Sequence, residues 1–327
     1  MKKYIIGLDI GGTKTSCVIG TKKGRILGKS LFPTETQKGS SQTLKRIIKN
    51  IKELLRRLDI TLAEVEGMGI GAPGPLDPIK GVILNTPNMP GWNNVCLKEI
   101  FSRKFNLPVI LDNDANAAAL GEKIFGAGKD IGDMFYFTVS TGIGGGLIIG
   151  GKVYHGASFD AAEVGHTVVL VDGPKCKCGK RGCLEALASG TAIARKAKEK
   201  VKFEPSSLIL KLAGNSSSIT ARIVSQAAEK GDELAKQIFQ EAGRFLGIGV
   251  ANVLNLINPQ MVVIGGGVSL AGELLFKPMK ESAKKEAFGK TYQVCQIVPS
   301  KLKDKVGDLG AVSLVFNKYR RKDGGHS

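Results

Sequence analysis

The sequence has no long hydrophobic run, and none of its apolar segments approaches the roughly 20 residues that a membrane-spanning helix needs. The amino terminus, Met-Lys-Lys-Tyr, leads directly into a predicted strand, and we read no signal peptide there. Tryptophan occurs once and histidine three times in 327 residues. Because 43% of the residues are hydrophobic, we still expect two medium-sized domains with proper cores. We expect a cytoplasmic protein without a membrane partner.

Acidic residues are scarce relative to basic ones, with 29 Asp and Glu against 47 Lys and Arg and a net charge of +18. Such a charge suggests nucleic-acid binding. The basic residues are spread out, however, and many occupy the polar positions of an amphipathic helix predicted between residues 44 and 58. A solvated helix face explains them better, so we expect no nucleic-acid partner. A positive field would also favour a small anionic substrate such as a nucleotide.

Three of the six cysteines lie within eight residues of one another, and a histidine precedes them. Three sulfurs and one nitrogen are the donors that a closed tetrahedral zinc site needs. Three reduced cysteines in a basic loop are the alternative, and a disulfide is weaker because nothing indicates an oxidising compartment. We therefore predict structural Zn²⁺ on His166, Cys176, Cys178 and Cys183.

Two glutamates bracket this cluster, Glu163 before His166 and Glu185 after Cys183. Zinc on one nitrogen of His166 would fix the other as an N–H donor. Glu163 precedes His166 by three residues and would face the same way on a helical turn. Two carboxylates and an imidazole donor suit a ligand with several hydroxyls. The pattern therefore indicates a sugar.

Two segments share a pattern of strand, glycine- and threonine-rich turn, and returning strand, one at residues 4–19 and one at residues 134–149. Such turns direct backbone N–H groups and a hydroxyl at one point, which suits phosphate. The repetition indicates an internal duplication, and two such turns would clamp a nucleotide across a cleft. Asp9 ends the first strand and either holds Mg²⁺ through water or caps the turn. The candidate nucleotide-binding residues are Asp9, Gly11, Gly12, Thr13, Lys14, Thr141, Gly142 and the later glycine loop Gly265, Gly266 and Gly267.

The segment Gly69-Ile-Gly-Ala-Pro-Gly74-Pro75 matches the dinucleotide-binding glycine fingerprint, but its prolines are poorly suited to a helix start. We interpret it as a rigid loop that approaches a ligand. Another predicted strand delivers Asp112-Asn113-Asp114 at its carboxyl end, where α/β proteins place chemistry. One of the two aspartates could cap the following helix, which leaves the other for a second role. Later helices are expected at residues 184–201, 219–230, 233–256, 270–287 and 309–319.

Taken together, these motifs resemble the ROK family of sugar kinases and repressors, and most closely its bacterial-type glucokinases. The resemblance covers nearly the whole chain. Its motifs include the Asp-Ile-Gly-Gly-Thr-Lys turn, Pro-Asn, Asn-Asp-Ala-Asn, the second glycine turn, Glu-Val-Gly-His, the Cys-x-Cys-Gly-x-x-Gly-Cys-x-Glu run and the triple glycine. It implies an α/β fold of the actin/hexokinase type, with two ribonuclease-H-like domains and an interdomain cleft. We expect a small domain over residues 1–115, joined by a helix at about 307–320, and a large domain over residues 116–306 that carries the zinc loop.

The resemblance also implies roles for individual residues. Asp114 would be the catalytic base, and the two glycine turns would lie at the phosphates of ATP with Mg²⁺. The glycine loop at 265–267 would lie near the adenosine. The implied sugar-binding residues are Gly74, Asn88, Asn113, Asp114, Glu163, His166 and Glu185.

The implied reaction is ATP-dependent phosphorylation of a hexose, with glucose converted to glucose 6-phosphate by a homodimer or homotetramer. Alternatives are a kinase for N-acetylmannosamine, N-acetylglucosamine, fructose or allose, or a non-catalytic sugar-sensing regulator. Family repressors carry a DNA-binding domain ahead of the kinase-like body, whereas the first hairpin here begins at residue 4. One departure concerns the segment before Glu163, which is glycine-rich in the family but contains Phe159 and Asp160 here. This change bears on which sugar is accepted.

Overall fold

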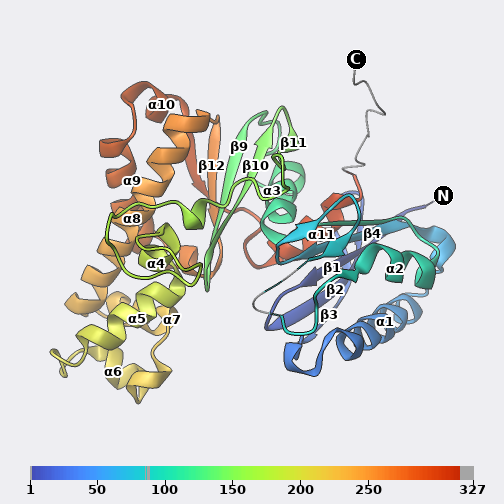
Figure 1. Ribbon diagram of the computed structural model, residues 1–327, viewed down its shortest axis with the longest axis horizontal. Helices are drawn as coiled ribbons and strands as arrows, with labels where there is room; N and C mark the ends of the chain where they lie inside the picture. The colour runs from blue at the N-terminus through green and yellow to red at the C-terminus, as the bar shows by residue number, and fades with distance from the viewer. Residues whose placement is uncertain (1, 85, 87–88, 317–327) are drawn as a thin grey trace. The chain divides into compact units, whose positions relative to one another are not determined.

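The computed structural model describes residues 2–84, 86 and 89–316 (Figure 1). The chain forms two compact units. The first comprises residues 1–129, 152–161 and 304–327, and the second comprises residues 130–151 and 162–303. Helix α3 (Asp114–Phe125) belongs entirely to the first unit, whereas the predicted large domain begins at residue 116. The segment at 152–161 also returns to that unit.

The first unit is built on a five-stranded sheet in the order β3-β2-β1-β4-β8. Strands β1 and β2 form an antiparallel hairpin, whereas β4 and β8 run parallel to β1. Parallel neighbours place the carboxyl ends of β1, β4 and β8 at one edge of the sheet, where Gly71 pairs with both Asp9 and Asp112. The strands span Tyr4–Ile10 (β1), Lys14–Thr21 (β2), Ile26–Pro33 (β3), Val65–Ala72 (β4) and Val109–Asn113 (β8).

Helices cover both faces of this sheet, as expected for strands that are apolar on both sides. Helices α1 (Ser40–Arg57) and α2 (Leu97–Phe105) pack on one face, and α3 and α11 (Val306–Leu314) pack on the other; Figure 1 shows α1 and α11 on opposite sides. Helix α1 is amphipathic as predicted, with Ile47 and Ile51 fully buried and Lys45, Lys49 and Lys52 exposed.

The glycines of the apparent dinucleotide fingerprint serve close packing. A Cβ atom at Gly69 would overlap the carbonyl oxygen of Ala311, so only glycine lets α11 lie this close to β4. The chain then turns at a cis peptide bond between Gly74 and Pro75 into strand β5 (Leu76–Asp77), not into a helix. Strands β5, β6 (Val82–Ile83) and β7 (Val95–Cys96) form a small three-stranded sheet. The prediction that this proline-containing segment does not open a helix is confirmed.

The second unit repeats the strand pattern of the first. Strands β9 (Met134–Val139) and β10 (Ile143–Ile149) form an antiparallel hairpin, and β12 (Met261–Gly265) runs parallel to β9. The order β10-β9-β12 thus matches β2-β1-β4 of the first unit. Strand β13 (Gln296–Pro299) continues the sheet beyond β12, and β11 (Lys152–Val153) belongs to the first unit.

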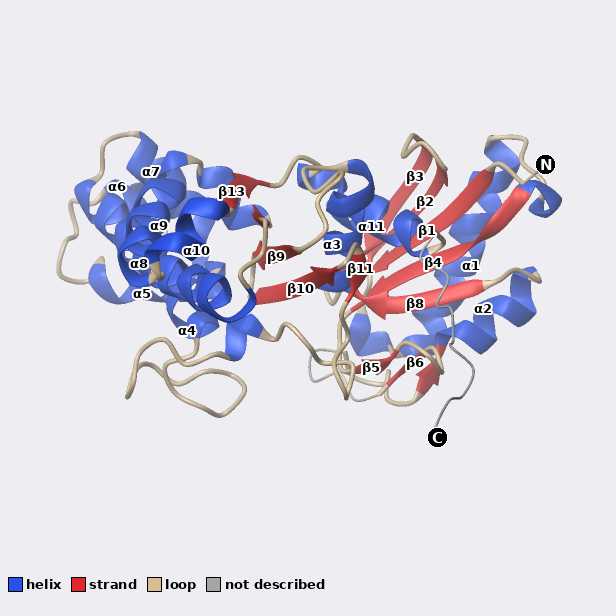
Figure 2. Ribbon diagram, turned by 90° about the horizontal axis from the view of Figure 1, so that it is seen from above, coloured by secondary structure: helices blue, strands red, loops and turns tan. Residues whose placement is uncertain are grey.

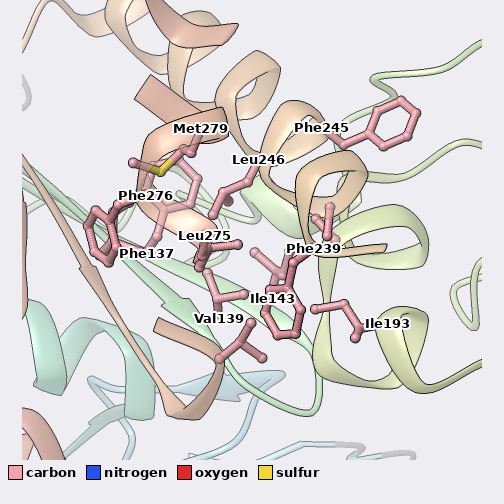
Figure 3. Close-up of a cluster of buried hydrophobic side chains, with 14 of the residues drawn as sticks. Phe137, Val139, Ile143, Ile193, Phe239, Phe245, Leu246, Leu275, Phe276 and Met279 are labelled. Carbon is pink, nitrogen blue, oxygen red and sulfur yellow. The ribbon is translucent and has the colours of Figure 1, made fainter. Parts of the chain in front are cut away.

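A helical layer packs on one face of strands β9 and β10, where Figure 2 shows the helices gathered. Figure 3 shows the resulting core, in which Phe137, Val139 and Ile143 of the sheet meet Phe239 of α8 and Met279 of α9. The helices of this unit are α4 (Leu184–Ala188), α5 (Gly190–Lys200), α6 (Leu208–Ala213), α7 (Ala221–Glu229), α8 (Glu233–Ile257), α9 (Glu273–Glu286) and α10 (Gly289–Val294).

Three predicted helices have different bounds in the structure. The helix expected at 184–201 is two helices, because Ser189 accepts a hydrogen bond from the Ala192 N–H and begins a new helix. The helix expected from 270 begins at Glu273, after a 3₁₀ turn over Gly267–Ala271. The final helix begins at Val306 and ends at Leu314, and the predicted residues from 317 onwards lie outside the described range.

Within the described residues, no helix combines the length and the apolar character that crossing a membrane requires.

Candidate active site

The junction between β8 and α3 holds the predicted base. The side chain of Asn113 accepts the Ala115 N–H at 2.8 Å, so Asn113 is the N-cap of α3. Neither Asp112 nor Asp114 has that role, so the alternative in which an aspartate caps this helix was wrong. Asp114 is the first residue of the helix and is exposed. Asp114 therefore lies at the carboxyl edge of the sheet, on its solvent-exposed side.

Asp112 is buried at this junction, where its carboxylate contacts Asn113, Asn116 and His155. One carboxylate oxygen accepts the Asn113 N–H at 2.7 Å and the Asn116 side-chain amide at 3.1 Å. The other lies 2.9 Å from Nε2 of His155, in the segment that returns from the end of β11. An ionised carboxylate accepts only, so the imidazole nitrogen donates to it. Asp112 thus joins the strand, the helix and the returning segment.

The first glycine turn lies at the end of the β1–β2 hairpin. The Gly11 N–H donates to the Lys14 carbonyl at 3.0 Å, and Gly12, Thr13 and Lys14 are exposed. Thr34, fully buried after β3, holds the turn from behind: its hydroxyl donates to the Gly11 carbonyl at 2.6 Å and its N–H to the Thr13 carbonyl. The predicted phosphate turn is therefore exposed to solvent, and hydrogen bonds from Thr34 fix its backbone.

Asp9 lies at the end of β1, within the same unit. Burial, reinforced by the negative charges of Asp114 and Asp308, raises the pKa of Asp9 to about 7, although Lys14 and Lys29 oppose this shift. Asp308 itself is held by the Ser16 hydroxyl at 2.6 Å and by Lys29 at 2.5 Å. A cation beside Asp9 would relieve this crowding of negative charge, and carboxylate oxygens are the ligands that Mg²⁺ prefers.

Two sugar-binding candidates of the first unit remain. A Cβ atom at Gly74 would lie 3.2 Å from the side-chain nitrogen of Asn113, so these two predicted residues are neighbours. Asn88 lies outside the described residues.

The second glycine turn, between β9 and β10, is held by the start of α5. The Ser140 N–H donates to the Gly142 carbonyl at 2.9 Å, and the Gly190 N–H donates to the Ser140 carbonyl at 2.7 Å. The Thr191 hydroxyl donates to the carbonyl of Thr141 at 2.7 Å. The break between α4 and α5 therefore brings a helix amino terminus to the predicted phosphate turn, where its dipole favours an anion.

A pocket of about 830 Å³ opens beside this turn. Thr141 and Gly267 line it together with residues of α7 and its cap, among them Thr220, Arg222 and Gln226. At Gly267 nothing would lie within 4 Å of a Cβ atom, whereas at Gly265 a Cβ would overlap the Tyr136 hydroxyl. Gly267 thus faces open space, and Gly265 is needed for packing. The volume suits a nucleoside.

The four predicted metal ligands are brought together. The ligand atoms of His166, Cys176, Cys178 and Cys183 all lie within 4.8 Å of one another, with Sγ of Cys178 3.6 Å from Sγ of Cys183 and Sγ of Cys176 3.8 Å from Nδ1 of His166. Tetrahedral ligands at about 2.0–2.3 Å from zinc are separated by roughly 3.5–3.8 Å. The donor set and its spacing fit Zn²⁺.

Electrostatics within the cluster differ between the thiols. Burial raises the pKa of Cys183 to about 12, with smaller contributions from Cys178 and Cys176. The backbone N–H of Lys180 lowers the pKa of Cys178. All six cysteines are free thiols.

The two glutamates approach different ligands of the cluster. Nδ1 of His166 faces the sulfur of Cys176, and Nε2 lies 4.0 Å from the Glu163 carboxylate. Glu185 accepts the Ile143 N–H at 3.0 Å with one oxygen and lies 3.9 Å from Sγ of Cys176 with the other. Glu185 therefore joins the cluster to the second glycine turn, a link that no sequence pattern predicted.

Sequence reasoning missed Thr34, His155 and the residues of α7 that line the pocket. Thr34 and His155 act on positions 21 to 43 residues away, so spacing gave no signal. Thr220 did carry a signal, because threonine is a typical N-cap and the helix predicted from residue 219 begins after it, at Ala221. Its side chain accepts the Ile223 N–H.

Known proteins share this arrangement. A ROK family profile matches residues 5–318. The chain is 39% identical over 314 residues to a glucokinase of Thermotoga maritima, covering 96% of this chain and 98% of the relative. It is 34% identical to a xylose repressor of Caldicellulosiruptor bescii, covering 96% of this chain and 78% of the repressor.

A crystal structure of a ROK family glucokinase from Streptomyces griseus in complex with glucose and AMPPNP superposes with a TM-score of 0.82. That protein is 36% identical to this chain, and the alignment covers 96% of this chain and 99% of that one. The predicted fold class is confirmed by this likeness.

Proposed function

Because the chain belongs to the ROK family, we propose that it is an ATP-dependent hexose kinase that phosphorylates glucose to glucose 6-phosphate. The observation that carries the proposal is the β8–α3 junction, where Asn113 takes over the helix cap and leaves Asp114 exposed at the carboxyl edge of the sheet. Glucokinases 35–39% identical over nearly the whole chain support the same reaction.

Asp114 is the proposed catalytic base. Its carboxylate accepts the proton of the sugar hydroxyl as that oxygen attacks the γ-phosphoryl group of ATP, and ADP leaves. In the first unit, Gly74, Asn88 and Asn113 are the proposed sugar-binding residues. In the second unit, Glu163, His166 and Glu185 have that role. The contact of Glu185 with the Ile143 N–H gives it a second task, which is to support the glycine turn.

The two glycine turns are the proposed phosphate-binding elements. The first turn contributes Gly11, Gly12, Thr13 and Lys14, and Thr34 holds its backbone in place. The second offers Thr141 and Gly142 beside the amino terminus of α5. The pocket between Gly267 and α7 receives the adenosine, with Gly265 and Gly266 shaping the loop.

Two metal ions fit this chain. Asp9 would hold Mg²⁺, which neutralises charge on the phosphates when bound; the crowding of Asp9 by Asp114 and Asp308 supports this role. His166, Cys176, Cys178 and Cys183 would hold a structural Zn²⁺. Thiolate ligands and free cysteines support a cytoplasmic location.

A sugar-responsive regulator is the second candidate, because the xylose repressor matches 96% of this chain. An assay that couples ADP release to NADH oxidation separates the two, run with glucose, mannose, fructose, allose, N-acetylglucosamine and N-acetylmannosamine. We expect glucose to give the highest kcat/KM. A chain that binds glucose in calorimetry but releases ADP with none of these sugars would be a sensor and not a kinase.

A further inference from the structure

We propose that His155 is a positioning residue that fixes the β8–α3 junction for catalysis, and that Phe159 holds His155 in place. This inference rests on the proposed function, because the junction carries the proposed base Asp114. It assigns a task to the segment 155–161, which follows β11 and belongs to the first unit.

The contact between His155 and Asp112 is almost completely shielded from water. The Asp112 side chain is 1% exposed and the His155 side chain 14%, with Nε2 and the carboxylate oxygen 2.9 Å apart. A buried carboxylate needs donors on both oxygens, because desolvation otherwise makes its charge costly. His155 supplies a donor for Oδ2, the oxygen that does not contact Asn113 and Asn116.

The other oxygen of Asp112 organises the site directly. It accepts the N–H of Asn113, which caps α3 and precedes Asp114, and the side-chain amide of Asn116 one turn into the helix. The side-chain oxygen of Asn116 is buried and has no hydrogen-bond partner among the described residues, so the Asn116 amide group depends on Asp112 for its orientation. A rotation of the Asp112 carboxylate would therefore move the cap and the first turn of α3 together.

Phe159 completes the arrangement from the segment that follows His155. Its ring meets the imidazole edge to face, with centroids 6.4 Å apart and an interplanar angle of 72°. The Ala161 N–H donates to the His155 carbonyl at 3.1 Å and closes the segment into a loop.

The backbone conformation at Phe159 indicates that its side chain has a specific role. Phe159 has a φ of 70°, a left-handed conformation that is costly for a bulky residue and free for glycine. Ala162 also has a φ of 70°. A phenylalanine in such a position is favourable only if its ring gains a compensating contact, and the edge contact with His155 is that contact.

Two substitutions of His155, by glutamine and by asparagine, test its positioning role, because the two amides are alike in polarity and differ by one methylene group. The amide nitrogen of glutamine reaches the position of Nε2, whereas asparagine is too short to reach Asp112. We expect His155→Gln to keep kcat within about threefold and His155→Asn to lower it on the order of 10- to 100-fold, because small misplacements of catalytic groups are costly. Rates are expressed per glucose-binding site counted by calorimetry, so partial unfolding does not imitate the effect.

The matched loop pair is Phe159→Gly and Ala162→Gly. Both variants relieve a left-handed residue, but only the first removes the ring from His155. We expect Phe159→Gly to lower kcat by about three- to tenfold with the KM for ATP unchanged, and Ala162→Gly to stay within about twofold. This pair decides the matter if His155→Asn fails to fold.

The outcomes separate this inference from the proposed function. A parent chain that phosphorylates no sugar overturns the kinase proposal before any variant is compared. An active parent whose His155→Gln and His155→Asn variants have equal kcat, or whose two glycine variants behave alike, overturns the role of His155 and leaves the kinase standing. Rescue by glutamine together with loss in Phe159→Gly supports it.

Discussion

At the residue scale, three carboxylates define the chemistry of the first unit, and each is held differently. Asp112 is buried and hydrogen-bonded, Asp114 is exposed, and burial raises the pKa of Asp9 to about 7. Environments that separate the protonation of neighbouring carboxylates are typical of catalytic sites. The sequence motifs contain these three aspartates, but they do not show that their environments differ.

Asp9 gives a pH-dependent prediction. Because its folded pKa lies above the ordinary value of 3.8, the folded state holds a proton that the unfolded state releases between pH 4 and 7. The free energy of unfolding should therefore fall as pH rises through this window. Asp9→Asn removes this titrating group. Without Mg²⁺ the variant should therefore have a higher Tm than the parent at pH 8, by roughly 2–4 °C for each kcal/mol gained in the free energy of unfolding.

The measurement is a thermal melt of both proteins at pH 5 and pH 8 in magnesium-free buffer without chelator. The increase in Tm of Asp9→Asn over the parent should be larger at pH 8 than at pH 5. The variant should also lose activity with MgATP. An equal shift at both pH values would show that Asp9 does not titrate in this range.

At the element scale, the sequence predicted elements with a periodic apolar pattern well. The amphipathic helix α1 and both glycine-turn hairpins are confirmed, because burial of one face or of a whole strand leaves a clear signature. The break at Ser189 was missed, since the alanine-rich pattern continues through it and tertiary contacts place the new helix start. The Asp112–His155 pair joins positions 43 apart, a distance that no local pattern reports.

The start of α5 gives the second prediction. Ser189→Ala removes the N-cap, which costs about 1 kcal/mol of helix stability, and loosens the hold of Gly190 and Thr191 on the second glycine turn. The KM for ATP should rise several-fold. Ser207→Ala is the matched control, because it removes the N-cap of α6 away from the turn. Equal ATP kinetics in the two variants would show that α5 does not support the phosphate turn.

The metal loop gives the third prediction. Cys178→Ala should lose zinc, measured by elemental analysis, and should weaken glucose binding in calorimetry because His166 then lacks a fixed orientation. Since Glu185 joins the cluster to the turn at Gly142, affinity for an ATP analogue should fall too, by less. Cys96→Ala, outside the cluster, is the control. A folded, zinc-free Cys178→Ala with parental glucose affinity would separate the metal from the sugar site.

At the scale of the whole molecule, the two units share a strand order, and each contains different candidate functional groups. The order β2-β1-β4 in one unit matches β10-β9-β12 in the other, and each places a glycine turn after its first strand. The first unit adds the aspartates, and the second adds the metal cluster and the nucleoside-sized pocket. The net charge of +18 then favours an anionic substrate such as ATP.

The central claim is that Asp114 of this chain activates a sugar hydroxyl for phosphoryl transfer from ATP. The most direct test compares kcat and calorimetric glucose affinity in the parent and Asp114→Asn. Asp133→Asn is the control, because the Asp133 carboxylate lies in the second unit and accepts the Gly150 N–H. Removal of a positioned base should lower kcat on the order of 10²- to 10⁴-fold while glucose still binds. An Asp114→Asn variant that turns over glucose at a rate within a few-fold of the parent would contradict the account.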